Sequence, residues 1–223
     1  MQNGWSIIGY MCGRYAQSAP PKVIKKAFDL DRVPEFPERY NIAPSQIAPV
    51  IRLDDAGRLQ CELMRWGLVP HWAKDEKIAN HTINARIESA SSKPAFRDAW
   101  KRRRCIVPAT GFYEWQVKDG KQPYFIHRKD GQPFGFAGLW EYWNSPEGEL
   151  HTYTIMTMDA DEFMRPIHER MPVMVPADRI DGWLSHMQGS EVGYDLDEME
   201  MYPVSTYVNS PRNDGPGCAM AKE

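Results

Sequence analysis

The sequence predicts a single α+β domain built on a mostly antiparallel, barrel-like sheet with flanking helices. A length of 223 residues suits one hydrophobic core better than two small ones. Short apolar runs follow one another closely, and their breaks, such as KDGKQP and KDGQP, are typical of hairpin turns. Segments with helical spacing interrupt these runs rather than alternating regularly with them, which favours an antiparallel sheet.

Each expected element depends on a local pattern. The first helix opens at proline and places Val23, Ile24, Ala27 and Phe28 at helical spacing. The expected helices are 20–30, 93–103, 160–167 and 177–186. Two apolar runs around the Asp–Gly turn at 54–57 predict the first hairpin. The expected strands are 48–53, 60–66, 104–107, 111–117, 123–128, 134–143, 151–158 and 202–208.

The composition narrows the class of protein. Hydrophobic residues make up 42% and charged residues 26%, the balance of a soluble globular chain. Its apolar runs are too short for a transmembrane helix, and the first ten residues do not resemble a signal peptide, so we expect a cytoplasmic protein. No two of the 4 cysteines form a CxxC pair. We therefore expect free thiols and neither a metal nor a cofactor.

The net charge of −3 conceals an asymmetry between the two halves of the chain. Residues 1–110 hold 18 Lys and Arg against 11 Asp and Glu, an excess of +7, whereas residues 111–223 hold 9 against 19, an excess of −10. A basic face that contacts phosphate is one interpretation, because local charge governs such contacts. Interleaving of the two halves in space, with cancellation of the charges, is the other.

Met11 directly precedes Cys12 near the start of the chain. Taken alone, such a cysteine is most often a small buried hydrophobe. Removal of every residue through Met11 would leave an α-amine and a thiol on Cys12. An α-amine has a pKa of roughly 7.7–8.0, so part of it is neutral and can attack an aldehyde to form a Schiff base. The thiol can then close a five-membered thiazolidine, because intramolecular closure gains greatly in effective concentration. An N-terminal Cys12 is therefore a natural trap for aldehydes.

Short motifs continue along the chain from this point. They are MCGRY at 11–15, RYNIAP at 39–44, RWGLVP at 65–70, INARIE at 83–88, RCIVP at 104–108, GFYEW at 111–115, IHERMP at 167–172 and PVS at 203–205. In kind and in order they resemble the SRAP family, the SOS-response-associated peptidases that process abasic sites. The resemblance implies an SRAP-like fold.

The resemblance also divides the chain into three parts. Residues 1–10 form an extension, 11–209 the SRAP domain, and 210–223 a tail whose Pro, Gly and Asn content predicts flexibility. In the family the cysteine follows the initiator methionine, whereas here ten residues precede Met11. We expect either that translation starts at Met11 or that proteolysis, by the protein itself or another, removes the extension.

Four residues match the catalytic positions of the family. Cys12 resembles the nucleophile, and Asn84 resembles the residue that positions it. Glu114 resembles the general acid/base, and its aromatic neighbours are expected to desolvate it and raise its pKa. His168 resembles a second proton-transfer group, suited by its near-neutral pKa.

The resemblance further implies a DNA-binding set. Guanidinium groups match phosphate geometry, and the apolar loop from Trp66 to Trp72 resembles one that stacks on or separates bases. The expected DNA-binding residues are Arg14, Arg39, Asn41, Trp66, Gly67, Pro70 and Arg86.

Structural interpretations compete with several of these roles. On sequence alone Asn84 suits a turn better than a catalytic role, Glu114 suits the outward side of a strand, and His168 suits the carboxyl end of a helix. Trp66 suits a core, where most tryptophans lie.

The resemblance implies an enzyme that senses and shields abasic sites in single-stranded DNA. It would form a covalent thiazolidine crosslink through an N-terminal cysteine and process itself to expose that residue. We expect no membrane partner, favour a monomer, and expect nucleoid association on DNA.

Three rival functions stay open. An N-terminal-nucleophile glutaminase also begins Met-Cys-Gly, but it expects an Asn-Gly pair, and Ala85 follows Asn84 here. A papain-like protease would use Cys12 and His168 and would have no role for Glu114. A non-catalytic single-strand binder would leave no covalent product.

Overall fold

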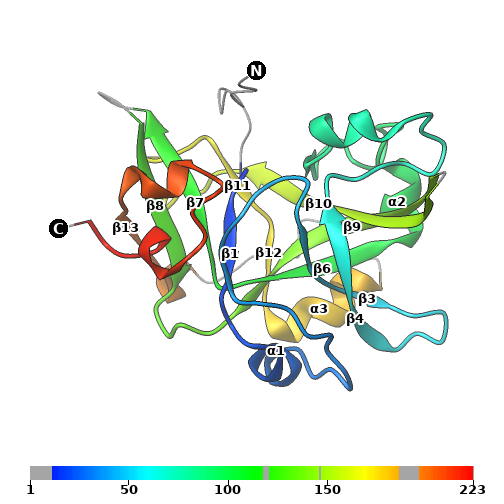
Figure 1. The fold of residues 1–223 in the computed structure, drawn as a ribbon, viewed down its shortest axis with the longest axis horizontal. Helices are drawn as coiled ribbons and strands as arrows, with labels where there is room; N and C mark the ends of the chain where they lie inside the picture. The colour runs from blue at the N-terminus through cyan, green and yellow to red at the C-terminus, as the bar shows by residue number, and fades with distance from the viewer. Residues whose placement is uncertain (1–11, 118–120, 146, 186–195, 223) are drawn as a thin grey trace.

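The computed structural model describes residues 12–117, 121–145, 147–185 and 196–222. Within these ranges the chain forms a closed barrel and a second antiparallel sheet, with a few short helices around them (Figure 1). The predicted fold class, one α+β domain with a barrel-like, mostly antiparallel sheet, is confirmed.

Five strands close the barrel: β3 (Ile47–Leu53), β4 (Leu59–Trp66), β6 (Arg104–Ala109), β9 (Phe134–Ser145) and β10 (Gly148–Asp159). Neighbours pair antiparallel from β4 through β3, β6 and β9 to β10, and β10 then pairs in parallel with β4 to complete the ring. Three shorter strands extend this sheet: β5 (Asn84–Arg86), β11 (Arg170–Pro172) and β12 (Met174–Val175).

The second sheet has the order β13-β8-β7-β1-β2 and lies beside the barrel, on the left of Figure 1. Its strands are β1 (Tyr15–Gln17), β2 (Arg39–Ile42), β7 (Gly111–Val117), β8 (Lys121–Arg128) and β13 (Met199–Pro203). One buried cluster joins it to the barrel, where Tyr15 packs edge-on against Trp66 with ring centroids 5.3 Å apart. The strand that follows Cys12 is thus anchored in the main core.

The helices are short and cover the barrel. They are α1 (Pro21–Ala27), α2 (Arg97–Arg102) and α3 (Ile180–Leu184). Turns of 3₁₀ helix complete the described elements: η1 (Glu76–His81), η2 (Ala177–Arg179), η4 (Leu196–Glu198), η5 (Thr206–Asn209) and η6 (Pro216–Cys218). None of the helices in the described ranges is long and apolar enough to cross a membrane.

Three sequence predictions differ from the structure. Residues 160–167 form turns rather than a helix, because Pro166 lacks a donor and disfavours helical backbone before it. The strand expected over 202–208 ends at Pro203, and the Ser205 hydroxyl accepts from the Tyr207 amide to start η5. The helix expected over 177–186 is η2 followed by α3, and residue 186 lies outside the described residues.

The tail expected to be flexible also differs. Residues 210–222 fold back over the second sheet: the Asp214 carboxylate accepts from two backbone amides of β2, Val204 bridges Ala221, and Cys218 is fully buried. Composition alone predicted otherwise, because Pro, Gly and Asn suit an ordered turn as well as a loose end.

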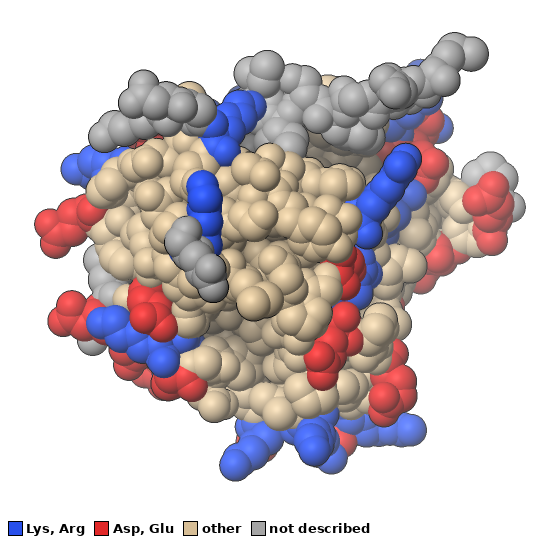
Figure 2. All heavy atoms as spheres, turned by 60° about the vertical axis from the view of Figure 1, so that its left-hand side comes forward, with Lys and Arg blue, Asp and Glu red and all other residues tan. Residues whose placement is uncertain are grey.

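The two oppositely charged halves of the sequence interleave. The first-half strands β1 and β4 pair with the second-half strands β7 and β10. Figure 2 shows a broad face with few charged side chains, and both acidic and basic groups stand around its rim. Much of the charge asymmetry along the chain is therefore mixed in space.

Candidate active site

Strand β7 brings Glu114 to Cys12, which lies 102 residues earlier in the chain. The Cys12 backbone N–H donates to Glu114 Oε1 over 2.6 Å, and both residues are buried, with 0% and 2% of their surfaces exposed. A carboxyl group therefore stands at the Cys12 nitrogen, which a cut before Cys12 would convert into an α-amine.

The backbone of Cys12 is left-handed, with φ of 46°, which is uncommon for a residue other than glycine. Extended backbone would place Cys12 on the same face as Ala16, because alternate residues of a strand share a face. Instead Cys12 joins Tyr15 in the main core, whereas Ala16 lies in a separate cluster. The left-handed turn therefore directs Cys12 toward the side of the sheet that faces the barrel.

Glu114 titrates near neutral pH. Burial raises its pKa to about 8, and hydrogen bonds from the Cys12 and Trp115 amides partly offset this effect. The titratable group beside it is the Cys12 thiol, whose pKa is raised by burial and further by Glu114. A carboxyl group with this pKa can both give and accept a proton at cellular pH.

Asn84 lies on β5, which pairs in parallel with β10 at Ile155. Its Nδ2 is buried, and no described residue accepts a hydrogen bond from it. Buried amide donors without an acceptor are rare in folded proteins and call for an explanation. A ligand oxygen would supply the missing acceptor.

His168 follows a turn that lies against β7. Gln116 is two residues beyond Glu114, so it shares the face of Glu114, and its Nε2 donates to the Pro166 carbonyl over 3.0 Å. His168 Nδ1 accepts from the Arg170 amide over 3.1 Å, so the neutral ring carries its proton on Nε2. Among the described residues, neither His168 nor Asn84 is hydrogen-bonded to Cys12 or Glu114.

Among known protein families, the sequence profile of the SOS response associated peptidase (SRAP) family matches residues 11–211 of this chain. The chain belongs to the SRAP family. It is 43% identical to abasic site processing protein YoqW of Bacillus subtilis, over 92% of this chain and 97% of that protein. It is 34% identical to abasic site processing protein HMCES of chicken, over 82% of this chain and 66% of that protein.

A solved structure shares the fold. A crystal structure of a protein from Bacteroides thetaiotaomicron superposes with a TM-score of 0.82 at 27% identity, covering 95% of this chain and all of that chain. The resemblance that the motifs indicated is therefore confirmed at the level of the SRAP family and its fold.

The residues expected to bind DNA in this SRAP domain are distributed over different environments. Arg86 is exposed at the end of β5, two residues from Asn84. Arg39 is half-buried; it pairs with Asp214 and donates to Gln46.

Arg14 and Asn41 are buried against the C-terminal segment. Arg14 Nη1 donates to Asn41 Oδ1 over 3.0 Å and to the Val208 carbonyl over 2.9 Å, and Arg14 Nη2 donates to the Asn209 carbonyl over 3.2 Å. Asn41 is fully buried, and Arg14 is 7% exposed. In the structure their polar groups form hydrogen bonds with other residues of the chain and do not face solvent.

The apolar loop divides in the same way. Trp66 is fully buried, stacks on Tyr153 and donates from Nε1 to the Ile83 carbonyl. It therefore lies in the core, as the structural alternative expected. Gly67 has φ of 115°, and a Cβ there would lie 2.9 Å from the Ala79 carbonyl oxygen, so the position needs glycine for conformation. Pro70 is buried, whereas Trp72, two residues on, is 49% exposed.

Sequence reasoning missed the partners that surround this set. Asp214 and Trp115 contact the predicted residues or flank them, and Arg170 orients His168. Asp214 lies 175 residues from Arg39 in the chain, so no local pattern marked it, whereas Trp115 and Arg170 lie within the motifs at 111–115 and 167–172. Among the described residues, no group of three or more His, Cys, Asp or Glu side chains could hold a metal ion.

Proposed function

We propose that this SRAP protein captures abasic sites in single-stranded DNA by forming a thiazolidine between Cys12 and the sugar aldehyde. The observation that carries the proposal is the 2.6 Å contact between the Cys12 nitrogen and the buried Glu114 carboxyl. The names of the related proteins, which are abasic site processing proteins, support the same substrate.

The reaction first needs a free α-amine on Cys12. If the extension is translated, the Cys12 thiol can attack the Met11 carbonyl, so that the peptide bond to nitrogen breaks and a thioester forms. Glu114 can take the proton that the thiol loses and give a proton to the departing nitrogen, beside which its Oε1 lies. Water then hydrolyses the thioester, leaving a carboxylate on Met11 and both the amine and the thiol free on Cys12.

Aldehyde capture follows. The neutral amine adds to the sugar aldehyde to give a carbinolamine, which loses water to form an imine; the thiol then adds to the imine carbon and closes the ring. Glu114 can take a proton from the ammonium group, because its carboxyl oxygen lies at this nitrogen and burial raises the pKa of the carboxyl group toward that of an α-amine. The same group can protonate the departing hydroxyl. Asn84 Nδ2, which has no acceptor among the described residues, could donate to the aldehyde oxygen.

In this proposal His168 is a second proton-transfer group. Its Nδ1 is occupied by the Arg170 amide, so Nε2 is the atom that donates a proton. Opening of the sugar hemiacetal, which exposes the aldehyde, is the step that needs such a second donor.

A denaturing gel tests the proposal. Protein processed to Cys12 is mixed with single-stranded DNA that contains one abasic site, and an adduct resistant to denaturation is expected. Cys12→Ser keeps the amine and loses ring closure, so it leaves at most an imine that borohydride traps. An undiminished adduct from Cys12→Ala, or efficient crosslinking by a chain that retains its first eleven residues, would contradict the proposal.

A further inference from the structure

The face of the second sheet that points away from Cys12 is covered by residues 206–218, here called the C-terminal brace. Residues of the second sheet and of the brace together form a buried cluster that is separate from the main core. It includes Ala16 of β1, Tyr113 and Trp115 of β7, and Val208 and Cys218 of the brace. Glu114 alternates with Tyr113 and Trp115 along β7, so the brace packs directly behind the reactive pair.

The brace holds the strand that carries Cys12 through Arg14. The guanidinium group is buried and is held by neutral acceptors in the described structure, which are the Val208 and Asn209 carbonyls and the Asn41 side chain. A buried cation without a carboxylate partner is costly unless such acceptors remain in place. The position of the brace and the position of Arg14, two residues after Cys12, are thus coupled.

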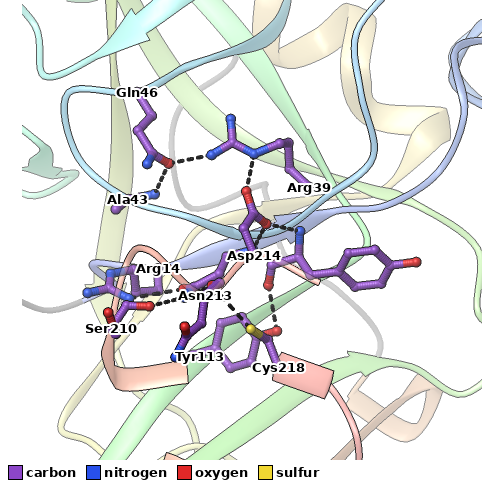
Figure 3. A network of polar contacts seen from close by, with 11 residues as sticks. Arg14, Arg39, Ala43, Gln46, Tyr113, Ser210, Asn213, Asp214 and Cys218 are labelled. Atoms are coloured by element: carbon purple, nitrogen blue, oxygen red, sulfur yellow. Dashed lines mark hydrogen bonds and ion pairs between the residues drawn. The ribbon is translucent and has the colours of Figure 1, made fainter. Parts of the chain in front are cut away.

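Asn41 and Asp214 hold the brace to β2 through hydrogen bonds. Figure 3 shows Asp214 at the centre of this network, beside Arg39. Asn41 Nδ2 donates to the carbonyls of Val208, Ser210 and Asn213 over 3.0, 3.0 and 2.7 Å. In return, Asp214 Oδ1 accepts from the amides of Tyr40 and Asn41 over 2.6 and 2.9 Å.

Arg39 adds an ion pair to Asp214 from the same strand. Because β2 is an edge strand of its sheet, the Asp214 carboxylate satisfies amide groups that another strand would otherwise pair.

The brace also reaches β7 on either side of Glu114. Trp115 Nε1 donates to Asn209 Oδ1 over 2.8 Å. Tyr113 belongs to the same buried cluster as Val208 and Cys218 of the brace, and its hydroxyl donates to the Tyr40 carbonyl of β2 over 2.7 Å. Asn209 therefore contacts both strands of the site: its carbonyl holds Arg14, and its side chain holds Trp115.

We propose that the C-terminal brace is a positioning element for the reaction, in which Asn209 and Asp214 hold the Cys12 strand and the Glu114 strand at the separation that proton transfer needs. This inference rests on the proposed function. It assigns Arg14 and Asn41 to the positioning of Cys12. Their alternative role, as direct ligands of DNA phosphate, is a distinct outcome of the same test.

The first experiment measures single-turnover adduct formation against DNA concentration for Asn209→Ala and Asp214→Asn in the processed chain. We expect the saturating rate to fall about tenfold or more, the range in which misplaced groups lose rate. We expect the half-saturating DNA concentration to stay within about twofold of wild type. Asp54→Asn is the matched control, because Asp54 also accepts from two backbone amides and pairs with an arginine, but in the distant β3–β4 turn.

The second experiment does not depend on adduct formation. In the full chain, infrared titration follows the carbonyl band of protonated Glu114, which Glu114→Gln identifies. In Asn209→Ala a loosened brace admits water, so we expect the band to disappear at a pH at least one unit lower than in wild type. The titration can be measured even if the wild-type protein forms no adduct. Absence of an adduct would refute the proposed function but not the effect of the brace on Glu114.

Unchanged saturating rates together with an unchanged Glu114 titration in folded Asn209→Ala would overturn the inference. A rise in half-saturating DNA concentration with a flatter salt dependence, and no change in rate, would overturn it in favour of phosphate binding. If Asp214→Asn does not fold, Asn209→Ala still decides, because that change removes one side-chain hydrogen bond and leaves the backbone carbonyl to Arg14.

Discussion

Replacement of Glu114 by glutamine tests the central chemistry of the site. The substitution keeps the shape of the side chain and an oxygen that can accept from the Cys12 amide, and it removes the titrating proton. The fold and the affinity for DNA are therefore expected to survive. The rate of adduct formation is expected to fall by a factor on the order of 10²–10⁴, the usual effect of losing a general acid or base. This corresponds to about 3–5 kcal/mol in the activation barrier.

The same substitution has a second, independent signature in stability. In the full chain, Glu114 has a pKa of about 8 in the folded state, against about 4.3 for an unperturbed glutamate. Between these two values the folded state binds more protons than the unfolded state. The stability that Glu114 contributes is therefore complete below about pH 4.3 and is lost as the pH rises toward 8.

The magnitude follows from the size of the shift. Each pH unit in this window costs about 1.4 kcal/mol, so the whole window amounts to roughly 4–5 kcal/mol. Glutamine does not titrate, so the free energy of unfolding of Glu114→Gln does not decrease with pH in this way. The free energy of unfolding of the variant, relative to wild type, is expected to rise by several kcal/mol between pH 5 and pH 8. In a chain cut before Cys12 the rise is expected to be smaller, because the ammonium group stabilises the carboxylate.

Two assays check these expectations. Single-turnover time courses of adduct formation are measured from pH 5 to 9 for the processed wild type and Glu114→Gln. Denaturant unfolding of the full chains is measured over the same range. Equal rates across the range would assign proton transfer to another group, with His168 the next candidate. Parallel stability curves for the two full chains would show that Glu114 is not held protonated.

Further predictions concern other residues of the site. Cys12→Ala is expected to abolish the denaturation-resistant adduct on a denaturing gel, and an adduct that persists would refute the aminothiol chemistry. Arg86→Ala is expected to weaken binding of single-stranded DNA and to reduce the slope of log affinity against log salt by about 0.7; the exposed, distant Arg58→Ala is the control in a fluorescence titration. Arg14→Ala is expected to lower the free energy of unfolding by about 2–4 kcal/mol, because buried carbonyls lose their donor; unchanged stability with weaker DNA binding would restore the phosphate role. Trp66→Ala is expected to cost about 3–5 kcal/mol in the same unfolding assay, as a fully buried aromatic does.

Much of the barrel could be predicted from local patterns. The hairpin of β3 and β4 and the run of strands from β6 to β10 follow alternation and turn residues that lie within a few positions of one another. The short strands β1, β2, β5, β11 and β12 were missed, because each spans only 2–4 residues. A period cannot be detected in so few residues.

The proposed catalytic set and the proposed DNA-binding set both come from the motifs. Cys12 and Glu114, drawn from separate motifs, form one hydrogen-bonded pair in the structure. Arg14 and Arg39 were expected to bind phosphate and Asn41 to bind DNA, and in the structure the donors of all three contact the brace. Side-chain chemistry alone cannot tell a phosphate oxygen from a carbonyl or carboxylate oxygen of the same chain.

The sequence by itself determined that Met11 precedes Cys12, from which the aminothiol chemistry is proposed, and most of the strands of the barrel. Both are properties of residues that are neighbours in the chain. Only the tertiary structure decided that Glu114 stands at the Cys12 nitrogen, that Cys12 turns into the core, and that residues 206–218 close the back of the site. Burial, and with it the pKa of Glu114, depends on atoms brought together from positions more than 100 residues apart, which no local pattern encodes.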